Sequence, residues 1–111
     1  MKIVNLEQFR KYPSGTLYSK YEPCVFNGLM IKCDTLLHDF VYQDLIGNVK
    51  AHDSGEYANK LESALETGES LELDFDFAGR DGLFEDDQLF AVYEENDVKQ
   101  LIDRITNETK H

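Results

Sequence analysis

The sequence predicts an α+β fold: a mostly antiparallel sheet of about five strands with three helices, in the order α-β-β-β-α-β-β-α. Two observations lead to this prediction. Short β-prone runs are separated by turn residues such as Asn27-Gly28, and short turns join antiparallel strands. Apolar residues recur at helical spacing in three other segments. With 111 residues, residues 1–111 are expected to form a single domain. We expect the helices to cover one face of the sheet, and a curled, partly closed barrel is the alternative.

The three helices are expected over residues 6–12, 55–67 and 98–105. Each follows a side chain that commonly caps a helix N-terminus, namely Asn5, Asp53 (or Ser54) and Asp97. Gln8 and Glu56 lie three residues after the first two caps, which is the spacing of a capping box. Gly68 is expected to end the second helix, because glycine readily adopts the left-handed conformation found at helix C-termini.

The β-prone segments cover residues 16–21, 24–26, 29–31, 40–46, 49–51, 71–77 and 88–94. Asn27-Gly28 is expected to form a hairpin turn, because both central positions of such a turn need positive φ. Residues 71–77 alternate strictly between apolar and acidic side chains, which predicts a strand with its apolar side chains inward and its carboxylates outward. Residues 88–94 are apolar at nearly every position, so this strand is expected to be central.

Negative charge is concentrated in the C-terminal half of the chain. Residues 1–50 carry six Lys/Arg and five Asp/Glu, whereas residues 51–111 carry five and seventeen, so the whole chain has a net charge of −11. Residues 69–97 contain eleven carboxylates and one base, Arg80. Such a concentration argues against direct binding to nucleic acid or to an anionic membrane. It favours a basic protein surface as the partner.

The predicted partner-binding residues are the acidic side chains of this region: Glu72, Asp74, Asp76, Glu85, Asp86 and Asp87. On a strand, alternate residues share one face and repeat at about 6.6–6.8 Å, so the first three are expected to form an exposed row that the others extend. Phosphates along a nucleic-acid strand are also a row of anions, so this row could occupy a groove built for nucleic acid. The alternative is an ordinary solvated sheet face.

A cation-binding loop is a second hypothesis for this acidic segment, over residues 74–85. Asp74, Asp76, Gly79 and Glu85 follow the spacing of a calcium-binding loop, but Ala78 supplies no side-chain oxygen at the fifth position. The flanking segment alternates like a strand, whereas a calcium-binding loop of this kind is flanked by helices. We therefore expect no metal and no cofactor, and weak divalent binding is left as the alternative.

Catalytic signatures are not evident. Cys24 and Cys33 are expected to share a sheet face diagonally if the hairpin turns at Asn27-Gly28, and to act as small buried hydrophobes. A pocket for a small ligand such as a nucleotide signal would need basic and aromatic side chains, for which Lys20, Tyr21 and Lys32 are the candidates. No nucleophile, base and oxyanion partner occur at a recognisable spacing, so we expect that the protein is not an enzyme.

Location is predicted from what the sequence lacks. No run approaches the roughly 20 apolar residues of a membrane span. Residues 1–5 lack the apolar core of a signal peptide. The two cysteines are too few for a disulfide scaffold. We expect an intracellular protein that does not bind membranes.

Two segments resemble small accessory proteins of bacteriophages and prophages: GTLYSKYEPCVF at residues 15–26 and DQLFAVY at residues 87–93. The resemblance implies the cytoplasm of a bacterial host and a dispensable phage function. Small acidic phage proteins of that kind are often inhibitors of host nucleases and of other DNA-binding defences.

Together these observations predict a non-enzymatic phage accessory protein that inhibits a host protein by occupying its basic, nucleic-acid-binding surface. One alternative is an immunity protein that neutralises a basic nuclease toxin, since the electrostatics would be the same. The other is the small-ligand binding protein described above. The oligomeric state is not predicted.

Overall fold

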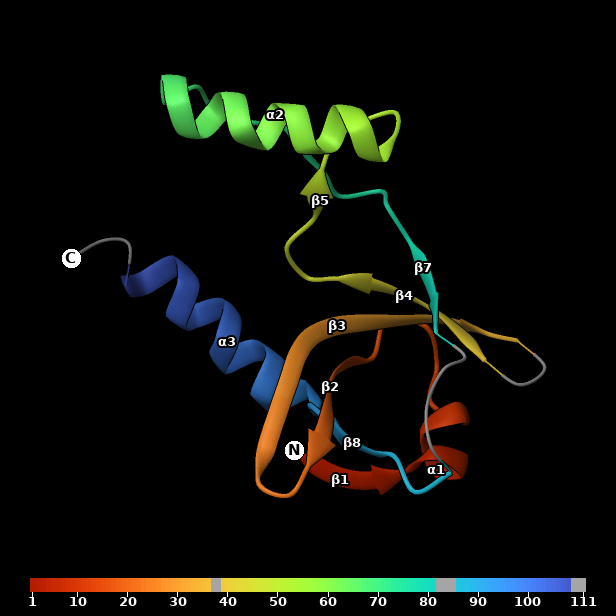
Figure 1. Cartoon of the computed structure of the whole chain (residues 1–111). Helices are drawn as coiled ribbons and strands as arrows, with labels where there is room; N and C mark the ends of the chain where they lie inside the picture. Colours follow the sequence, from red (N-terminus) through yellow and green to blue (C-terminus); the bar gives the residue numbers. More distant parts are fainter. Residues whose placement is uncertain (37–38, 82–85, 109–111) are drawn as a thin grey trace.

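The computed structural model describes residues 1–36, 39–81 and 86–108 and has an α+β architecture (Figure 1). Its elements are β1 (Lys2–Asn5), α1 (Leu6–Arg10), β2 (Leu17–Glu22), β3 (Val25–Thr35), β4 (Phe40–Asp44), β5 (Asn48–Val49), α2 (Ser54–Thr67), β6 (Leu73–Asp74), β7 (Gly79–Asp81), β8 (Leu89–Val92) and α3 (Glu95–Glu108). Within the described ranges, one antiparallel sheet has the order β1-β8-β2-β3-β4-β7, and β5 pairs with β6 in a second, small sheet. The predicted fold class is confirmed, and β8 lies inside the sheet as expected.

The first helix is short and is set by its cap. The backbone N–H of Gln8 donates to the Asn5 side chain at 2.8 Å, and the Asn5 N–H donates to the Gln8 side chain at 3.0 Å. This is the predicted capping box. It orients α1 so that Phe9 points into the core, where it is fully buried.

The core is an aromatic cluster on one face of the sheet. The Phe9 ring stacks on Phe90 with centroids 4.1 Å apart, and Tyr18 and Phe40 approach the Phe9 ring at a tilt. The buried cluster consists of Val4, Phe9, Tyr18, Met30, Phe40, Phe90 and Val92. Because side chains of this size contribute most of a small domain's burial, this cluster holds β1, β2, β3, β4 and β8 together.

The helices do not share one face of the sheet, so that expectation was wrong. Phe9 of α1 covers the face that carries Tyr18 and Phe90. α3 lies beside Leu17 and Tyr93, which alternate with the core residues and therefore point to the opposite face. α2 lies apart from the large sheet, and among the described residues it packs extensively against no other element (Figure 1).

Asn27-Gly28 does not form the predicted hairpin turn. The chain turns at residues 23–24, between β2 and β3, and Gly28 lies within β3. Tyr18 pairs with Met30 whereas Lys20 pairs with Asn27, so β3 carries one extra residue at this point. Gly28 has φ of +73°, and a glycine with positive φ suits a β-bulge as well as a turn.

β3 bends strongly and curls the sheet (Figure 1). A second shift in register lies between Lys32 and Thr35, opposite β4, and bulges increase the local bend and twist of a strand. In the part of the chain that the structure describes, the two edge strands β1 and β7 do not pair with each other. The sheet is therefore curled but open, and the barrel alternative is not what forms.

The predicted strand over residues 71–77 was also wrong. Of these residues only Leu73–Asp74 form a strand, β6, which pairs with β5 through Asn48–Asp74 and Val49–Leu73. The Asp74 side chain accepts a hydrogen bond from the backbone N–H of Asp76 at 2.9 Å. A side chain that bonds the backbone two residues on is typical of a turn, and this turn ends the strand.

The last helix begins earlier than predicted. α3 starts at Glu95, so Asp97 lies in its first turn and is not the cap. The Asp97 side chain accepts from the backbone N–H of Glu94 and forms an ion pair with the amine of Met1 at 2.6 Å. The amine and that N–H lower the pKa of Asp97, while the carboxylates of Asp97 and Glu94 raise the pKa of the amine. These contacts attach the start of α3 to β1.

Candidate functional site

A projecting arm is the most distinctive surface of the molecule. We call residues 46–78 the arm. It contains β5, α2 and β6, and it leaves the large sheet after β4 and returns at β7 (Figure 1). The radius of gyration of the chain is 16.5 Å, whereas about 13 Å is typical of a compact domain of this length. The arm accounts for the elongated shape.

The ends of α2 are determined by neighbouring residues and not by contacts with the sheet. The Asp53 side chain accepts from the backbone N–H of Glu56 at 2.7 Å, as predicted for the cap. Glu56 does not close the capping box, because its carboxylate accepts from the backbone N–H of His52 instead. Gly68 has φ of +74° and ends the helix as expected.

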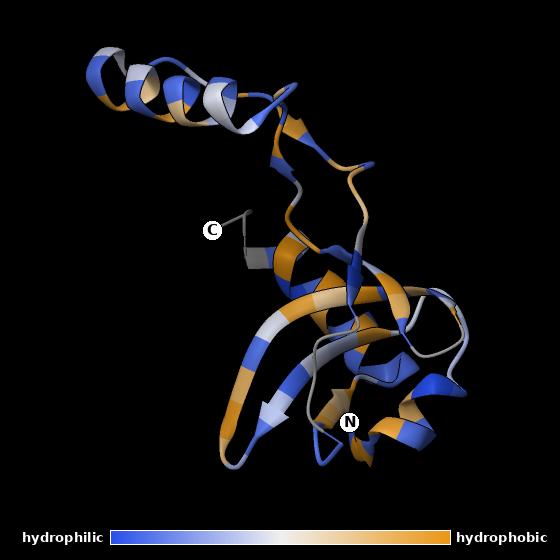
Figure 2. Cartoon of the chain, turned by 45° about the vertical axis from the view of Figure 1, so that its right-hand side comes forward, coloured by the Kyte–Doolittle hydropathy of each residue, from blue (hydrophilic) through white to orange (hydrophobic). Residues whose placement is uncertain are grey.

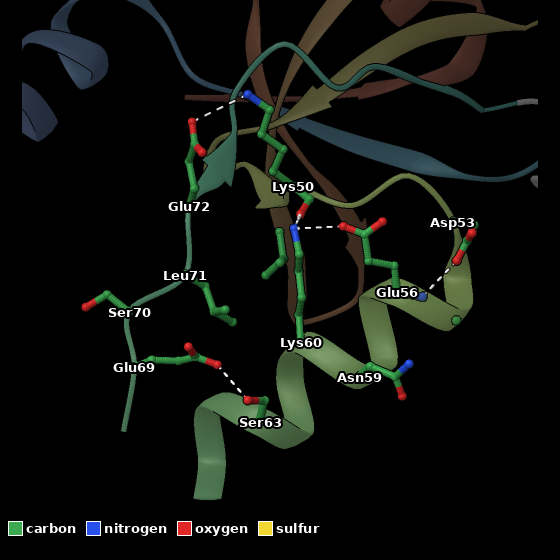
Figure 3. A pocket seen from close by; sticks show the side chains of 12 residues that line it. Lys50, Asp53, Glu56, Asn59, Lys60, Ser63, Glu69, Ser70, Leu71 and Glu72 are labelled. Carbon is green, nitrogen blue, oxygen red and sulfur yellow. Dashed lines mark hydrogen bonds and ion pairs between the residues drawn. The ribbon is translucent and has the colours of Figure 1, made fainter. Parts of the chain in front are cut away.

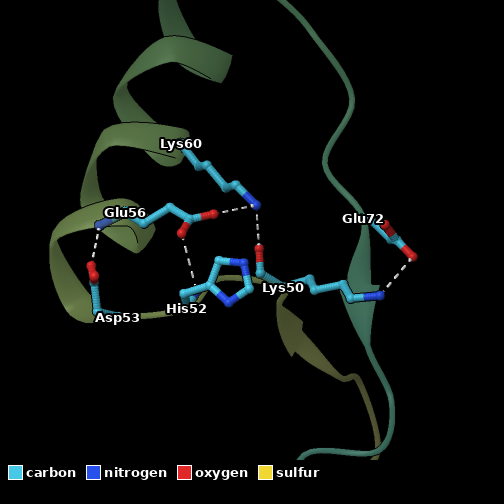
Figure 4. A network of polar contacts seen from close by, with 6 residues as sticks. All are labelled: Lys50, His52, Asp53, Glu56, Lys60 and Glu72. Atoms are coloured by element: carbon cyan, nitrogen blue, oxygen red, sulfur yellow. Dashed lines mark hydrogen bonds and ion pairs between the residues drawn. The ribbon is translucent and has the colours of Figure 1, made fainter.

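A network of polar contacts joins α2 to the strands of the arm (Figure 4). Lys60 Nζ donates to the backbone oxygen of Lys50 at 2.6 Å and pairs with the Glu56 carboxylate at 3.0 Å. Lys50 Nζ in turn lies 3.5 Å from Glu72 Oε1. The hydrogen bonds from Lys60 and from the His52 N–H lower the pKa of Glu56. The network therefore holds the carboxylate charged and α2 in place.

The base of the arm, which we call the neck, consists of Gly47 and residues 74–76. It is tied to the large sheet. The side-chain amide of Gln43, on β4, donates to the backbone oxygens of Phe75 and Asp76, both at 3.4 Å. Gly47 lies so close to β6 that a Cβ there would be 2.6 Å from the Asp74 oxygen. The first contact ties the base of the arm to β4, and the second holds the two strands of the arm close together.

A polar groove runs between α2 and the segment that precedes β6 (Figure 3). Its volume is about 760 Å³. Ser63 donates to the Glu69 carboxylate at 2.7 Å across it. The charged groups that line it are Lys50, Asp53, Glu56, Lys60, Glu69 and Glu72. Acidic groups outnumber basic ones, and the two lysines are both paired with carboxylates.

Three of the predicted binding residues lie on the arm. Glu72 is exposed beside Lys50, and Asp76 is exposed at the turn after β6. Asp74 is half-buried because its side chain bonds the backbone of that turn. The three therefore belong to one surface, but they do not form the regular row that a continuous strand would give.

The other predicted residues are not part of this surface. Asp86 and Asp87 are exposed just before β8. That segment lies at the far end of the molecule from α2, beside α1 (Figure 1). Glu85 lies outside the described residues. The carboxylates expected to converge are thus divided between the arm and the opposite end of the sheet.

Charge on the arm is nevertheless strongly negative. Its 33 residues contain eight carboxylates and two lysines, a net charge of −6, compared with −5 for all the other residues together. Lys50 and Lys60 pair with Glu72 and Glu56. The remaining carboxylates have no ion pair within the part of the chain that the structure describes.

The basic and aromatic residues considered for a small-ligand pocket are not brought together. Lys32 is only 1% exposed, and its ammonium donates to the Thr35 hydroxyl and to the backbone oxygen of Cys33. This burial lowers the pKa of Lys32. Lys20 is paired with Asp81 at 2.7 Å. Tyr21 is adjacent to Lys20 on β2 and so points to the other face.

The cysteines do not share a sheet face. Cys24 is exposed in the turn between β2 and β3, and Cys33 is half-buried on β3. The expected geometry depended on a turn at Asn27-Gly28, which does not form. Among the described residues, no cluster of three or more His, Cys, Asp or Glu side chains is placed to hold a metal ion.

Exposed apolar residues on the arm are a feature that the sequence did not predict. Leu73, Phe75 and Phe77 were expected to point into a core, but all three are exposed. The alternation of apolar and acidic residues shows that the two faces of the segment differ in polarity. It does not show whether the apolar face meets the rest of the same chain, so no signal in the sequence would have found these residues.

Comparisons with protein-family models, with curated proteins and with solved structures find no match to this chain. In the described part of the chain, none of the helices combines the length and the apolar character needed to cross a membrane.

Proposed function

We propose that the protein is a non-enzymatic phage accessory protein that inhibits a host protein by occupying its basic, nucleic-acid-binding surface. The arm is the part that makes the contact. The observation that supports this proposal is the net charge of −6 on 33 residues that extend away from the large sheet. A projecting element can enter a groove on a partner that the broad sheet cannot.

Electrostatics favour a basic partner over a nucleic acid or an anionic membrane. Glu62, Glu66 and Asp76 have no ion pair among the described residues, so they are available to lysine or arginine of a partner. Opposite charge accelerates association and makes it sensitive to salt. The same features would serve an immunity protein against a basic nuclease toxin, and a toxin gene beside this gene would favour that alternative.

The test is competition with DNA. Bacterial lysate is loaded on immobilised double-stranded DNA, and the column is washed with the protein in place of salt. We expect the wild-type chain to release a specific DNA-binding protein at low salt. The amount released beyond a protein-free wash at the same salt is expected to fall as salt rises, because salt also weakens the contact with the acidic arm. The variant Glu66→Lys/Asp76→Lys, which changes two carboxylates of the arm that have no ion pair among the described residues, is expected to release at least about tenfold less, because it removes two anions and adds two cations at the contact.

The matched control is Asp86→Lys/Asp87→Lys, which changes the net charge equally at the other end of the molecule. All four side chains are exposed, so neither variant is expected to unfold the chain. Full release by the arm variant would contradict the arm as the binding surface. Equal loss in both variants would show that net charge, and not the arm, governs the effect.

A further inference from the structure

The isolated chain exposes more surface than a compact monomer. Its accessible surface is 8148 Å², whereas about 6,300 Å² is typical of a folded monomer of 12.8 kDa. The excess is about 1,850 Å². A standard protein–protein interface buries about 800 Å² per partner, and obligate dimers bury more. The chain therefore leaves uncovered about as much surface as one stable interface would bury.

Apolar side chains make up much of this surface, and they gather on the arm. Half of the exposed large hydrophobic residues of the described chain lie there, namely Ile46, Leu61, Leu65, Leu73, Phe75 and Phe77. Leu65 is 89% exposed. Figure 2 shows that the apolar band of α2 lies on the side of the helix that faces the rest of the molecule. Leu61 and Leu65 thus form an uncovered apolar face.

This face is distinct from the polar groove. Residues Glu56, Asn59, Lys60 and Ser63 line the groove, and at about 100° per residue they lie on the side of α2 roughly opposite the leucines. The neck is tied to β4 through Gln43, as described above. In the structure α2 projects away from its own sheet (Figure 1), so its apolar face is left uncovered.

A second uncovered apolar row lies on α3. Val98 and Leu101 are half-buried against the sheet, whereas Ile102 and Ile105 are 55% and 56% exposed. α2 and α3 have 14 residues each. Two amphipathic helices of equal length, each with an uncovered row, can cover each other by packing ridges into grooves.

We propose that a second copy of this chain covers the apolar face of α2, in a two-fold symmetric dimer in which the arm of each chain packs against α3 of the other. Two-fold symmetry makes the contact twice. Such a contact would cover both rows on both chains. The excess surface of the single chain is large enough to supply an interface of this kind.

The effect of salt on affinity distinguishes the proposed dimer from the proposed complex with a basic partner. Each chain carries a net charge of −11, so two chains repel each other, and added salt weakens that repulsion. The dimer is therefore expected to tighten with salt, whereas a complex with a basic partner weakens. Because the inference does not depend on the proposed function, either can fail while the other stands.

The first test is sedimentation of the full chain over a range of concentrations at low and high salt. We expect a wild-type dimer whose Kd falls as salt rises. Leu65→Glu is expected to raise Kd at least about 100-fold, because each dimer would bury two unpaired carboxylates. Asn59→Glu adds the same charge on the groove side of α2 and is expected to remain dimeric.

The second test identifies the surface that α2 meets. Ile105→Glu on α3 is expected to dissociate the dimer as Leu65→Glu does, and mixing the two variant chains is expected to restore heterodimers through one intact α2–α3 contact. Circular dichroism checks that both variants fold, which is expected because both side chains are exposed in the single chain. A dimer that survives Ile105→Glu would overturn the proposed arrangement. A wild-type chain that is monomeric at every concentration and salt would overturn the dimer itself.

Discussion

Removal of the cap of α2 should make local opening of the arm more frequent and leave the stability of the sheet unchanged. The Asp53 side chain accepts from the Glu56 N–H at 2.7 Å, and Asp53→Ala removes that contact. The loss of such a cap costs about 1 kcal/mol, with a range of about 0.5–2. An isolated helix of 14 residues is only marginally stable in water. Since α2 packs extensively against no other element in the described part of the chain, the whole cost should appear in local opening of the arm.

Hydrogen exchange of backbone amides measures this opening element by element. The chain used carries Leu65→Glu, so that association does not protect the helix. We expect Asp53→Ala to lower the protection of α2 amides about fivefold, which corresponds to about 1 kcal/mol. Amides of β8, which lies between β1 and β2 in the large sheet, should exchange as before.

The matched control is Asn5→Ala, which removes the cap of α1. Asn5 accepts from the Gln8 N–H at 2.8 Å, so the chemistry is the same, but α1 carries Phe9 into the core. This variant should lower the protection of β8, because α1 and the sheet unfold together. If Asp53→Ala also lowered the protection of β8, the arm would be part of the same cooperative unit and the reasoning above would be wrong.

Two further predictions concern the core and the effect of pH. Phe9→Ala should lower the free energy of unfolding by about 3–5 kcal/mol in a denaturant titration, because it removes the ring that stacks on Phe90; a loss below about 1 kcal/mol would contradict the packing described. Lys60 lowers the pKa of Glu56 from its usual 4.5, so the stability from this pair is complete above that value and is lost as the pH falls through the lowered folded pKa. The helical circular dichroism of wild type should therefore fall more steeply in acid than that of Glu56→Gln, and parallel curves would argue against the pair.

The sequence was informative where structure is decided locally. Asn5 with Gln8, Asp53 and Gly68 were assigned to helix ends from neighbouring residues alone, and all four take those roles. The reason is that a cap satisfies backbone groups within three or four residues of itself. No distant part of the chain is needed.

Two of the wrong predictions concern elements whose form depends on pairing between strands that are distant in the sequence. Positive φ was expected at both Asn27 and Gly28, and only Gly28 has it. A single glycine with positive φ serves a turn or a bulge, and the pairing of β2 with β3 selects the bulge. The alternation at residues 71–77 was read as a strand of the main sheet. Only Leu73–Asp74 of this segment form a strand, and the strand pairs with β5 on the arm and not with the large sheet.

The carboxylates are divided between two separate surfaces, so the contribution of each surface to binding can be tested by itself. One continuous acidic face would have made every carboxylate of the C-terminal half equivalent. In the structure, Asp76 lies on the arm and Asp87 at the far end of the sheet, so each group can be reversed without altering the other. The arm also combines acidic residues with an uncovered apolar face. Salt acts oppositely on contacts made by these two kinds of surface, so the salt dependence of release from DNA and of self-association identifies which surface makes each contact.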